Sequence, residues 1–165
     1  MGKQTKAIIN MDIKTVIKEL NKALADEFLA AYQYWVGSKI VKGYFRKTVQ
    51  DELLQHSKDE FRHAEMITDR IIQLDGTPIL NPKDWYKLTT CGFAPPSNPN
   101  SIEILKQNLK GERCAIGIYN NLLKKIKDKD GNTFHMISHI LKDEIEHECD
   151  IEAILEDIQV SKKRS

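Results

Sequence analysis

Apolar residues recur at steps of three and four positions in four separate stretches of the chain. This spacing places the apolar side chains on one side of a helix, as in helices that pack together in a bundle. Asp12 supplies a cap for the first stretch, and Gly43 ends it. The pattern predicts helices over residues 12–42, 45–75, 101–129 and 133–159.

The connections between these helices differ greatly in length. Only a few residues join the first helix to the second, and the third to the fourth, so each pair is expected to form an antiparallel hairpin. Residues 76–100 form a long connection that holds all five prolines. A crossover along the bundle explains this length. The sequence therefore predicts an all-α four-helix bundle in one domain, residues 1–165, with a short basic tail at 160–165.

Composition and charge narrow the class of protein. A chain of 165 residues corresponds to roughly one domain. Its 25 Lys and Arg against 24 Asp and Glu give a net charge of +1, which argues against a protein that coats nucleic acid. No stretch approaches the ~20 apolar residues of a membrane helix, and the N-terminal apolar run is too short for a signal peptide. We therefore expect a cytoplasmic protein with no membrane partner.

Charged and histidine residues interrupt each apolar stripe at one level. Two of them form Glu-x-x-His motifs, in which the histidine shares a helix face with the glutamate three positions earlier. Each half of the chain contributes one lone glutamate and then a Glu-x-x-His, 33 positions later in the first half and 32 in the second. The six residues are Glu27, Glu60, His63, Glu112, Glu144 and His147.

The charge of these residues predicts a metal site. An unpaired buried carboxylate costs several kcal/mol, so four in one core require compensation. Two divalent cations would supply it, and carboxylates with one imidazole for each metal suit iron or manganese. The alternative is a set of boundary residues that reach solvent. A lone glutamate fits either interpretation, whereas six residues in one register favour a dinuclear site.

The order Glu, Glu-x-x-His, Glu, Glu-x-x-His resembles the ferritin-like superfamily, and bacterioferritin in particular. Tyr34, seven residues after Glu27, matches the tyrosine that this family keeps beside its di-iron centre. Two further stretches, residues 84–93 (DWYKLTTCGF) and 111–116 (GERCAI), are similar to the Dps-like thioferritins. This resemblance implies a ferritin-like fold, a hollow dodecamer and the oxidation of Fe(II) by hydrogen peroxide, with the ferric product stored as mineral.

The resemblance also implies a role for each site residue. Two iron ions would bind in each subunit, and manganese or zinc could replace them. The thioferritins place a cysteine pair near the metal site, and Cys91 and Cys114 match it, as a redox-active or bridging pair. Without the resemblance, two buried thiols are the simpler interpretation. The implied ligands are Glu27 and His63 for one iron, Glu112 and His147 for the other, and Glu60 and Glu144 as bridges, with Tyr34 beside them.

Departures from related proteins refine these expectations. Phe61 follows Glu60 where bacterioferritin carries its haem-ligating methionine, so no haem is expected. The chain has no pair of Cys-x-x-Cys motifs of the kind found in the rubredoxin module of rubrerythrin. Typical Dps proteins build their iron site between subunits, whereas this chain supplies all six ligands itself.

Several alternatives remain open from the sequence. The oxidant could be O2, as in bacterioferritin, or the protein could be a di-metal peroxidase that stores no mineral. A helical interaction module with structural carboxylates is a third alternative. Terminal lysines could contact DNA, although the near-neutral charge does not favour it. His56 is expected to be a hydrogen-bonded core residue and not a ligand, and Cys149 is expected on an outer surface.

Overall fold

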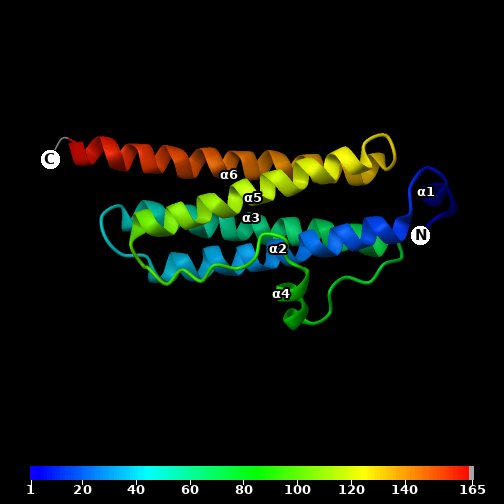
Figure 1. The fold of residues 1–165 in the computed structure, drawn as a ribbon, viewed down its shortest axis with the longest axis horizontal. Helices are drawn as coiled ribbons and strands as arrows, with labels where there is room; N and C mark the ends of the chain where they lie inside the picture. The colour runs from blue at the N-terminus through cyan, green and yellow to red at the C-terminus, as the bar shows by residue number, and fades with distance from the viewer. Residues whose placement is uncertain (164–165) are drawn as a thin grey trace.

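The computed structural model describes residues 1–163 and is all-α, with four long helices that form the bundle (Figure 1). Within these residues the one β-type pairing is an isolated bridge between Lys42 and Asn100. In chain order the elements are α1 (Lys3–Ala7), α2 (Ile13–Ile40), α3 (Arg46–Gln73), the 3-10 helix η1 (Pro82–Asp84), α4 (Trp85–Leu88), α5 (Ser101–Ile126) and α6 (Gly131–Lys163).

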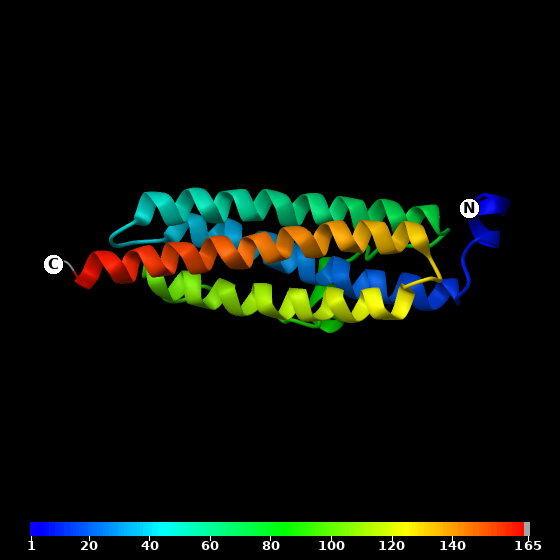
Figure 2. The same cartoon turned by 90° about the horizontal axis from the view of Figure 1, so that it is seen from above.

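The long helices are arranged as two hairpins joined by a crossover. Helix α2 packs along α3, and α5 packs along α6, and the two pairs lie side by side with their axes nearly parallel (Figure 2). Between α3 and α5 the chain returns along the whole bundle, carrying η1 and α4 on its outer side (Figure 1). This is the ferritin-like arrangement that the lengths of the connections predict.

The helix bounds differ from the predicted ones at several ends. Helices α2, α3 and α5 each stop two or three residues before the predicted end. Helix α6 begins two residues earlier than predicted and continues through Lys163, so residues 160–163 are helical. Residues 157–163 contain no glycine or proline to stop the helix, which explains its extra turn. Residues 164 and 165 of the predicted tail lie outside the described residues.

Local hydrogen bonds fix where the helices of the bundle begin. The Asp12 carboxylate accepts from the backbone N–H groups of Lys14 and Thr15, at 3.3 and 3.0 Å, and so caps α2. At the start of α5, Lys42 donates its backbone N–H to the Pro99 carbonyl at 2.8 Å, and the Lys42 carbonyl accepts from Ser101 at 3.1 Å. The end of the crossover is therefore tied to the turn between α2 and α3.

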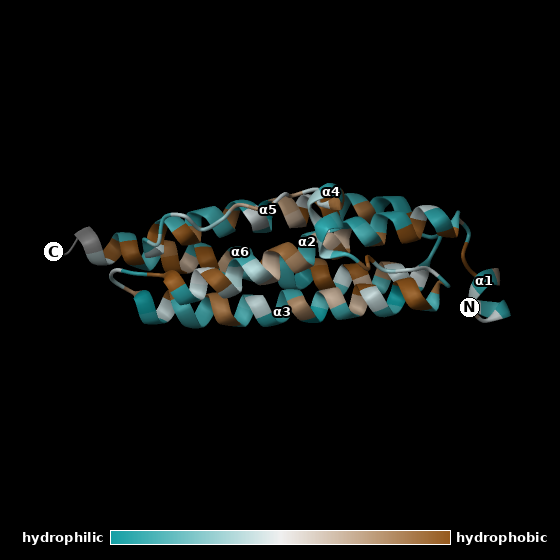
Figure 3. Ribbon diagram, turned by 90° about the horizontal axis from the view of Figure 1, so that it is seen from below, coloured by the Kyte–Doolittle hydropathy of each residue, from teal (hydrophilic) through white to brown (hydrophobic). Residues whose placement is uncertain are grey.

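The core consists of two apolar clusters with a polar layer between them. On α3, Val49 and Leu53 belong to one cluster, and Ile67 and Ile71 belong to the other. Hydrophobic and hydrophilic residues alternate along every long helix (Figure 3). None of the helices in residues 1–163 has an apolar stretch long enough to span a lipid bilayer. The helices thus bury apolar side chains above and below a layer that holds the charged residues.

A buried ion pair joins α3 to the turn between α5 and α6. Arg70 Nη2 donates to both carboxylate oxygens of Asp130, at 2.8 and 2.9 Å, and Arg70 Nε donates to Thr133 Oγ1 at 2.8 Å. The side chains of Arg70 and Asp130 are only 4% and 2% exposed. This bidentate pair fixes the level of the second hairpin relative to the first.

Candidate metal centre

The polar layer brings together all six residues that interrupt the apolar stripes. Each of the four long helices contributes to it, and none of the six residues is more than 4% exposed. Their donor atoms form two groups, in each of which all atoms lie within 4.8 Å of one another. The two groups share Glu60 and Glu144. The first group is Glu27, Glu60, His63 and Glu144, and the second is Glu60, Glu112, Glu144 and His147.

In the first group, three carboxylates converge on one imidazole nitrogen. His63 Nδ1 lies 3.1 Å from Glu144 Oε1, 3.3 Å from Glu60 Oε2 and 3.4 Å from Glu27 Oε2. These oxygens come from α6, α3 and α2, and one ring nitrogen carries at most one proton. Hydrogen bonding therefore cannot satisfy all three contacts, whereas a cation among the four atoms would.

The second group has the same design around His147 but is looser. Its Nδ1 lies 3.4 Å from Glu60 Oε1, and 3.9 Å from both Glu112 Oε1 and Glu144 Oε2. Glu60 and Glu144 direct one oxygen to each group. They are therefore placed as bridging ligands would be, with Glu27 and Glu112 at the two outer sides.

Two aspartates outside the layer hold the outer nitrogens of the histidines. His63 Nε2 lies 3.2 Å from Asp143 Oδ2, and His147 Nε2 lies 3.5 Å from Asp59 Oδ2. Each aspartate is on the helix opposite its histidine. A carboxylate behind the ring keeps a proton on Nε2 and leaves the Nδ1 lone pair for a metal. Sequence reasoning missed these residues, although an aspartate precedes the glutamate in both motifs.

Two tyrosines lie at the layer, and one of them contacts a carboxylate. Tyr119 on α5 donates its hydroxyl proton to Glu27 Oε1. Tyr34 is buried beside the layer, and its ring meets the ring of His56 edge-on with centroids 5.2 Å apart. Among the described residues it is Tyr119, and not Tyr34, that reaches a carboxylate of the layer.

His56 lies against the second group. Its Nε2 is 3.0 Å from Glu52 Oε1, as expected for a hydrogen-bonded core histidine. Its ring also stacks on His147, with centroids 3.9 Å apart, and its Nδ1 lies 3.9 Å from Glu112 Oε1. The position of His56 one turn before Glu60 indicated a buried residue but not this contact.

Burial and mutual repulsion shift the pKa values of the carboxyl groups. Burial raises the pKa of Glu27 and of Glu112 well above the ordinary value. The charges of Glu60 and Glu144 raise the pKa of Glu27 further, and those of Glu144 and Glu27 raise the pKa of Glu112. The pKa of Glu144 is raised by the same two causes. Burial also acts on Glu60, but contacts with the histidines outweigh it and lower its pKa. Without a cation, protons must compensate the excess negative charge.

The two histidines are affected in the opposite direction. Burial alone would lower the pKa of His63, but the contacts with Glu144, Glu27 and Glu60 prevail and raise it. The pKa of His147 is also raised, because the interaction with Glu60 outweighs burial. The layer therefore favours positive charge at its centre.

Unpartnered atoms show that the donor set fits divalent cations. Glu27 Oε2, Glu112 Oε1 and His147 Nδ1 are buried, and they make no hydrogen bond with any residue that the structure describes. Buried polar atoms without partners are rare and costly. Four carboxylates and two imidazoles are ligands that suit iron, manganese or zinc. Two such ions would satisfy the orphaned atoms and balance the four carboxylate charges.

A disulfide fastens the crossover to α5 beside the layer. It joins Cys91 to Cys114, 23 positions apart. The side chain of Asp26 on α2 holds the same stretch, accepting from the backbone N–H groups of Thr90 and Cys91 at 2.9 and 3.0 Å. Cys149 is exposed and forms no disulfide, as expected.

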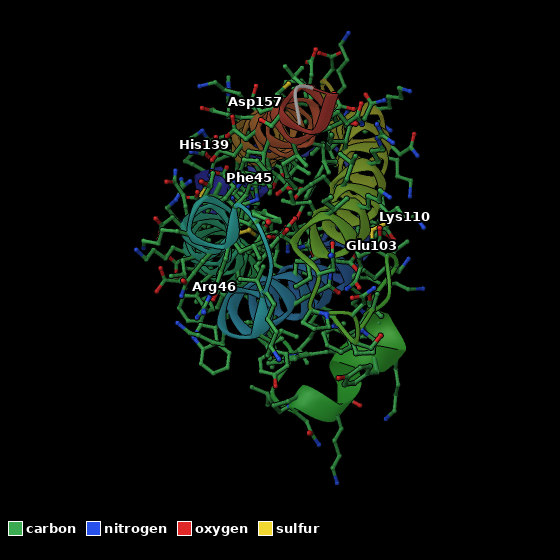
Figure 4. All side chains as sticks on the ribbon, turned by 90° about the vertical axis from the view of Figure 1, so that its left-hand side faces the viewer. Phe45, Arg46, Glu103, Lys110, His139 and Asp157 are labelled. Atoms are coloured by element: carbon green, nitrogen blue, oxygen red, sulfur yellow. A yellow bond between two sulfur atoms is a disulfide. The ribbon has the colours of Figure 1, made fainter. Side chains whose placement is uncertain are left out.

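A cavity of about 610 Å³ connects the carboxylates with the surface. Its lining includes the buried Glu27 and Glu112 and the exposed Lys106 and Lys110, together with Cys91 of the disulfide. Lys110, labelled in Figure 4, lies on α5 at the side of the bundle where the crossover passes. Small molecules therefore have a route to the layer between α2, α5 and the crossover.

Comparisons with known proteins agree with this geometry. A family described as "Ferritin-like domain" matches residues 17–160. The chain is 30% identical over 146 residues to the DNA protection during starvation protein of Pyrococcus furiosus. The aligned residues cover 88% of this chain and 79% of that protein. It is 41% identical over 63 residues to the bacterioferritin of Mycobacterium leprae, covering 38% of this chain and 40% of that one.

Solved structures show the same similarity. The bacterioferritin-related protein from Bacteroides fragilis, a dodecameric thioferritin, superposes with a TM-score of 0.95 at 41% identity, over 99% of this chain and 98% of that chain. The Dps of Thermosynechococcus elongatus has a TM-score of 0.81 at 14% identity, over 92% and 94% of the two chains, and shares the fold.

Proposed function

The chain belongs to the ferritin-like family, and on that basis we propose that it oxidises ferrous iron at the buried layer and stores the ferric product in a homo-oligomeric cage. The observation that carries this proposal is the pair of donor groups that share Glu60 and Glu144. A shared pair of carboxylates holds two cations close enough to react with one oxidant molecule. All the donors come from one chain, so each subunit would carry a complete site.

Hydrogen peroxide is the proposed oxidant, and two Fe(II) ions are the substrate at each site. One peroxide takes one electron from each ferrous ion, its O–O bond breaks, and two protons from solvent complete two water molecules. Two Fe(III) ions result. A single ferrous ion delivers one electron to peroxide and releases a hydroxyl radical. Because the paired site delivers both electrons, peroxide is reduced to water and no radical is released. The protein would thereby limit oxidative damage in the cytoplasm.

The similarity to the dodecameric thioferritin of Bacteroides fragilis supports a dodecamer as the assembly, and peroxide is the oxidant that the resemblance of the sequence to the thioferritins implies. The disulfide between Cys91 and Cys114 lies at the cavity that leads to the layer, which supports a redox role for this pair. A net charge of +1 does not favour DNA as a partner.

The decisive experiment compares two oxidants on the same loaded protein. The assembled protein receives two Fe(II) per chain without oxygen, and then peroxide in one sample and O2 in the other. Near-ultraviolet ferric absorbance should rise fast with peroxide and slowly with O2, and it should saturate near two irons per chain. A fast rise with O2 alone would assign oxygen-dependent oxidation. No rise above a protein-free control would refute the proposal.

Matched variants on α3 locate the reaction. Glu60→Gln removes a carboxylate of the layer and should abolish the fast phase. Glu65→Gln makes the same charge change at an exposed position of the same helix and should keep it. Storage is tested by adding iron well beyond two ions per chain and measuring the iron that co-elutes with the assembly. A peroxidase without storage would retain only the first two ions.

A further inference from the structure

A third group of potential ligands lies next to the dinuclear layer and outside the six residues assigned to it. Glu52 and His56 come from α3, and Asp150 comes from α6. Their donor atoms all lie within 4.8 Å of one another. The group therefore spans the two helices that carry the Glu-x-x-His motifs.

The spacing of this group suits a metal ion. His56 Nε2 and Glu52 Oε1 are 3.0 Å apart. Two ligand atoms that each lie about 2.1 Å from one metal ion are about 3.0–3.5 Å apart, so these two atoms need little movement. The His56 side chain is 1% exposed, that of Glu52 is 25% exposed, and Asp150 is exposed. The group is therefore anchored inside the bundle and open to solvent on one side.

The charges of the group call for a cation. Asp150 makes no hydrogen bond or ion pair within residues 1–163. Its pKa is raised by partial burial and by the negative charge of Glu52. The two carboxylates of the group carry two negative charges when ionised, which one divalent ion would balance.

The buried nitrogen of His56 provides independent support. His56 Nδ1 has no hydrogen-bond partner in the described part of the chain, and neither has Glu112 Oε1, which lies 3.9 Å away. Glu112 is ionised when it binds a metal ion of the dinuclear layer. If Nε2 then carries the only ring proton of His56 and donates it to Glu52, the Nδ1 lone pair faces a carboxylate oxygen and two acceptors oppose each other. A metal ion on Nε2 places the proton on Nδ1 instead, where it faces Glu112.

His56 also links this group to the dinuclear layer. Through Nδ1 it forms another group of donor atoms within 4.8 Å, together with Glu112 and His147. Donor atoms thus continue from the exposed Asp150 through His56 to the buried carboxylates. The rings of His56 and His147 are stacked with centroids 3.9 Å apart and an interplanar angle of 21°, so an ion close to both rings cannot lie in the planes of both, where their nitrogen lone pairs point. The outer group is therefore a separate position.

We propose that Glu52, His56 and Asp150 bind a third divalent transition-metal ion, which serves as a station for ions moving between solvent and the dinuclear centre. One imidazole nitrogen and two carboxylates suit Zn²⁺, Fe²⁺ or Mn²⁺. Binding at this site does not depend on whether the chain oxidises iron, whereas the role as a station rests on the proposed function.

Zinc binding to the metal-free assembled protein tests the site, measured by isothermal titration calorimetry with equilibrium dialysis. The wild type should bind three Zn²⁺ per chain, and Asp150→Asn should bind two. Asp150 is exposed and unpaired, so its replacement does not threaten the fold. Asp69→Asn makes the same change at an exposed, unpaired position of α3 and should keep three.

Two outcomes would overturn the site: a wild type that saturates at two Zn²⁺, or an Asp150→Asn variant that still binds three. A protein that binds three Zn²⁺ without oxidising iron would keep the site and refute the proposed function instead. The role as a station has its own readout. Asp150→Asn should slow the initial rate of iron oxidation at low Fe(II) while two irons per chain still react, and an unchanged rate would refute that role.

Discussion

Replacing Asp143 with alanine removes the carboxylate behind one histidine without touching the six residues of the layer. His63 Nε2 lies 3.2 Å from Asp143 Oδ2, and Arg62 Nη2 donates to the same oxygen at 2.9 Å. With the ring proton held on Nε2, Nδ1 keeps its lone pair for an ion shared with Glu27. Without Asp143 the ring can rotate or place its proton on Nδ1, which blocks that ligand.

The expected loss follows from the contact geometry. Removing an outer partner of a metal-bound histidine weakens metal binding by about 10–100-fold, or about 1.4–2.7 kcal/mol. The Asp143 side chain is 14% exposed, so water replaces it poorly. Asp59 is 25% exposed and lies 3.5 Å from His147 Nε2, so Asp59→Ala should cost less than Asp143→Ala.

A third variant separates orientation from charge. Asp143→Asn keeps one oxygen that can accept from both Arg62 and His63, but it loses the negative charge. The zinc affinity of Asp143→Asn should therefore fall between that of the wild type and that of Asp143→Ala.

Zinc affinity by calorimetry, with circular dichroism to confirm the helices, measures this series. Wild-type affinity in Asp143→Ala would refute the orienting role of the carboxylate. Equal losses in Asp143→Asn and Asp143→Ala would show that charge acts and not the position of the acceptor.

Three further variants test stability through urea unfolding. Arg70→Met leaves the buried Asp130 without its cation and should lower the unfolding free energy by about 3–5 kcal/mol, and a change near zero would contradict the buried pair. Replacing Cys91 and Cys114 with serine should lower it by about 3 kcal/mol, from the loop of 23 positions that the disulfide closes. Wild-type protein treated with reductant should show the same loss. Tyr119→Phe removes a hydrogen bond to a buried carboxylate on α2 and should cost the metal-free protein about 1–3 kcal/mol, whereas unchanged stability would show that the hydroxyl has another partner.

The fold could be predicted largely from local patterns. Apolar residues at steps of three and four identify the four long helices and place their ends to within about one turn. The length of residues 76–100 implies a crossover. The predicted helix ends were less accurate: the last helix was expected to end at residue 159, but no glycine or proline stops it there and α6 continues through Lys163. Short elements such as α1 and α4 were not predicted, since a single turn carries too little periodicity.

The sequence by itself determined which residues share a helix face. Glu60 and His63 must point the same way because they are three positions apart, and the repeat of this motif in the second half placed a second pair opposite. The identity of the six residues in the polar layer was therefore available without coordinates. Whether they bind metal remains a prediction that the geometry supports.

Only the tertiary structure decided how faces of different helices meet. Periodicity fixes the rotation of a side chain about its own helix, but not the axial level or the partner on another helix. Three contacts depend on that axial level. They are the pairing of Asp143 with His63, the hydrogen bond from Tyr119 to Glu27, and the position of His56 between two groups of donor atoms. Packing of the two hairpins sets it, and packing is a property of the whole chain.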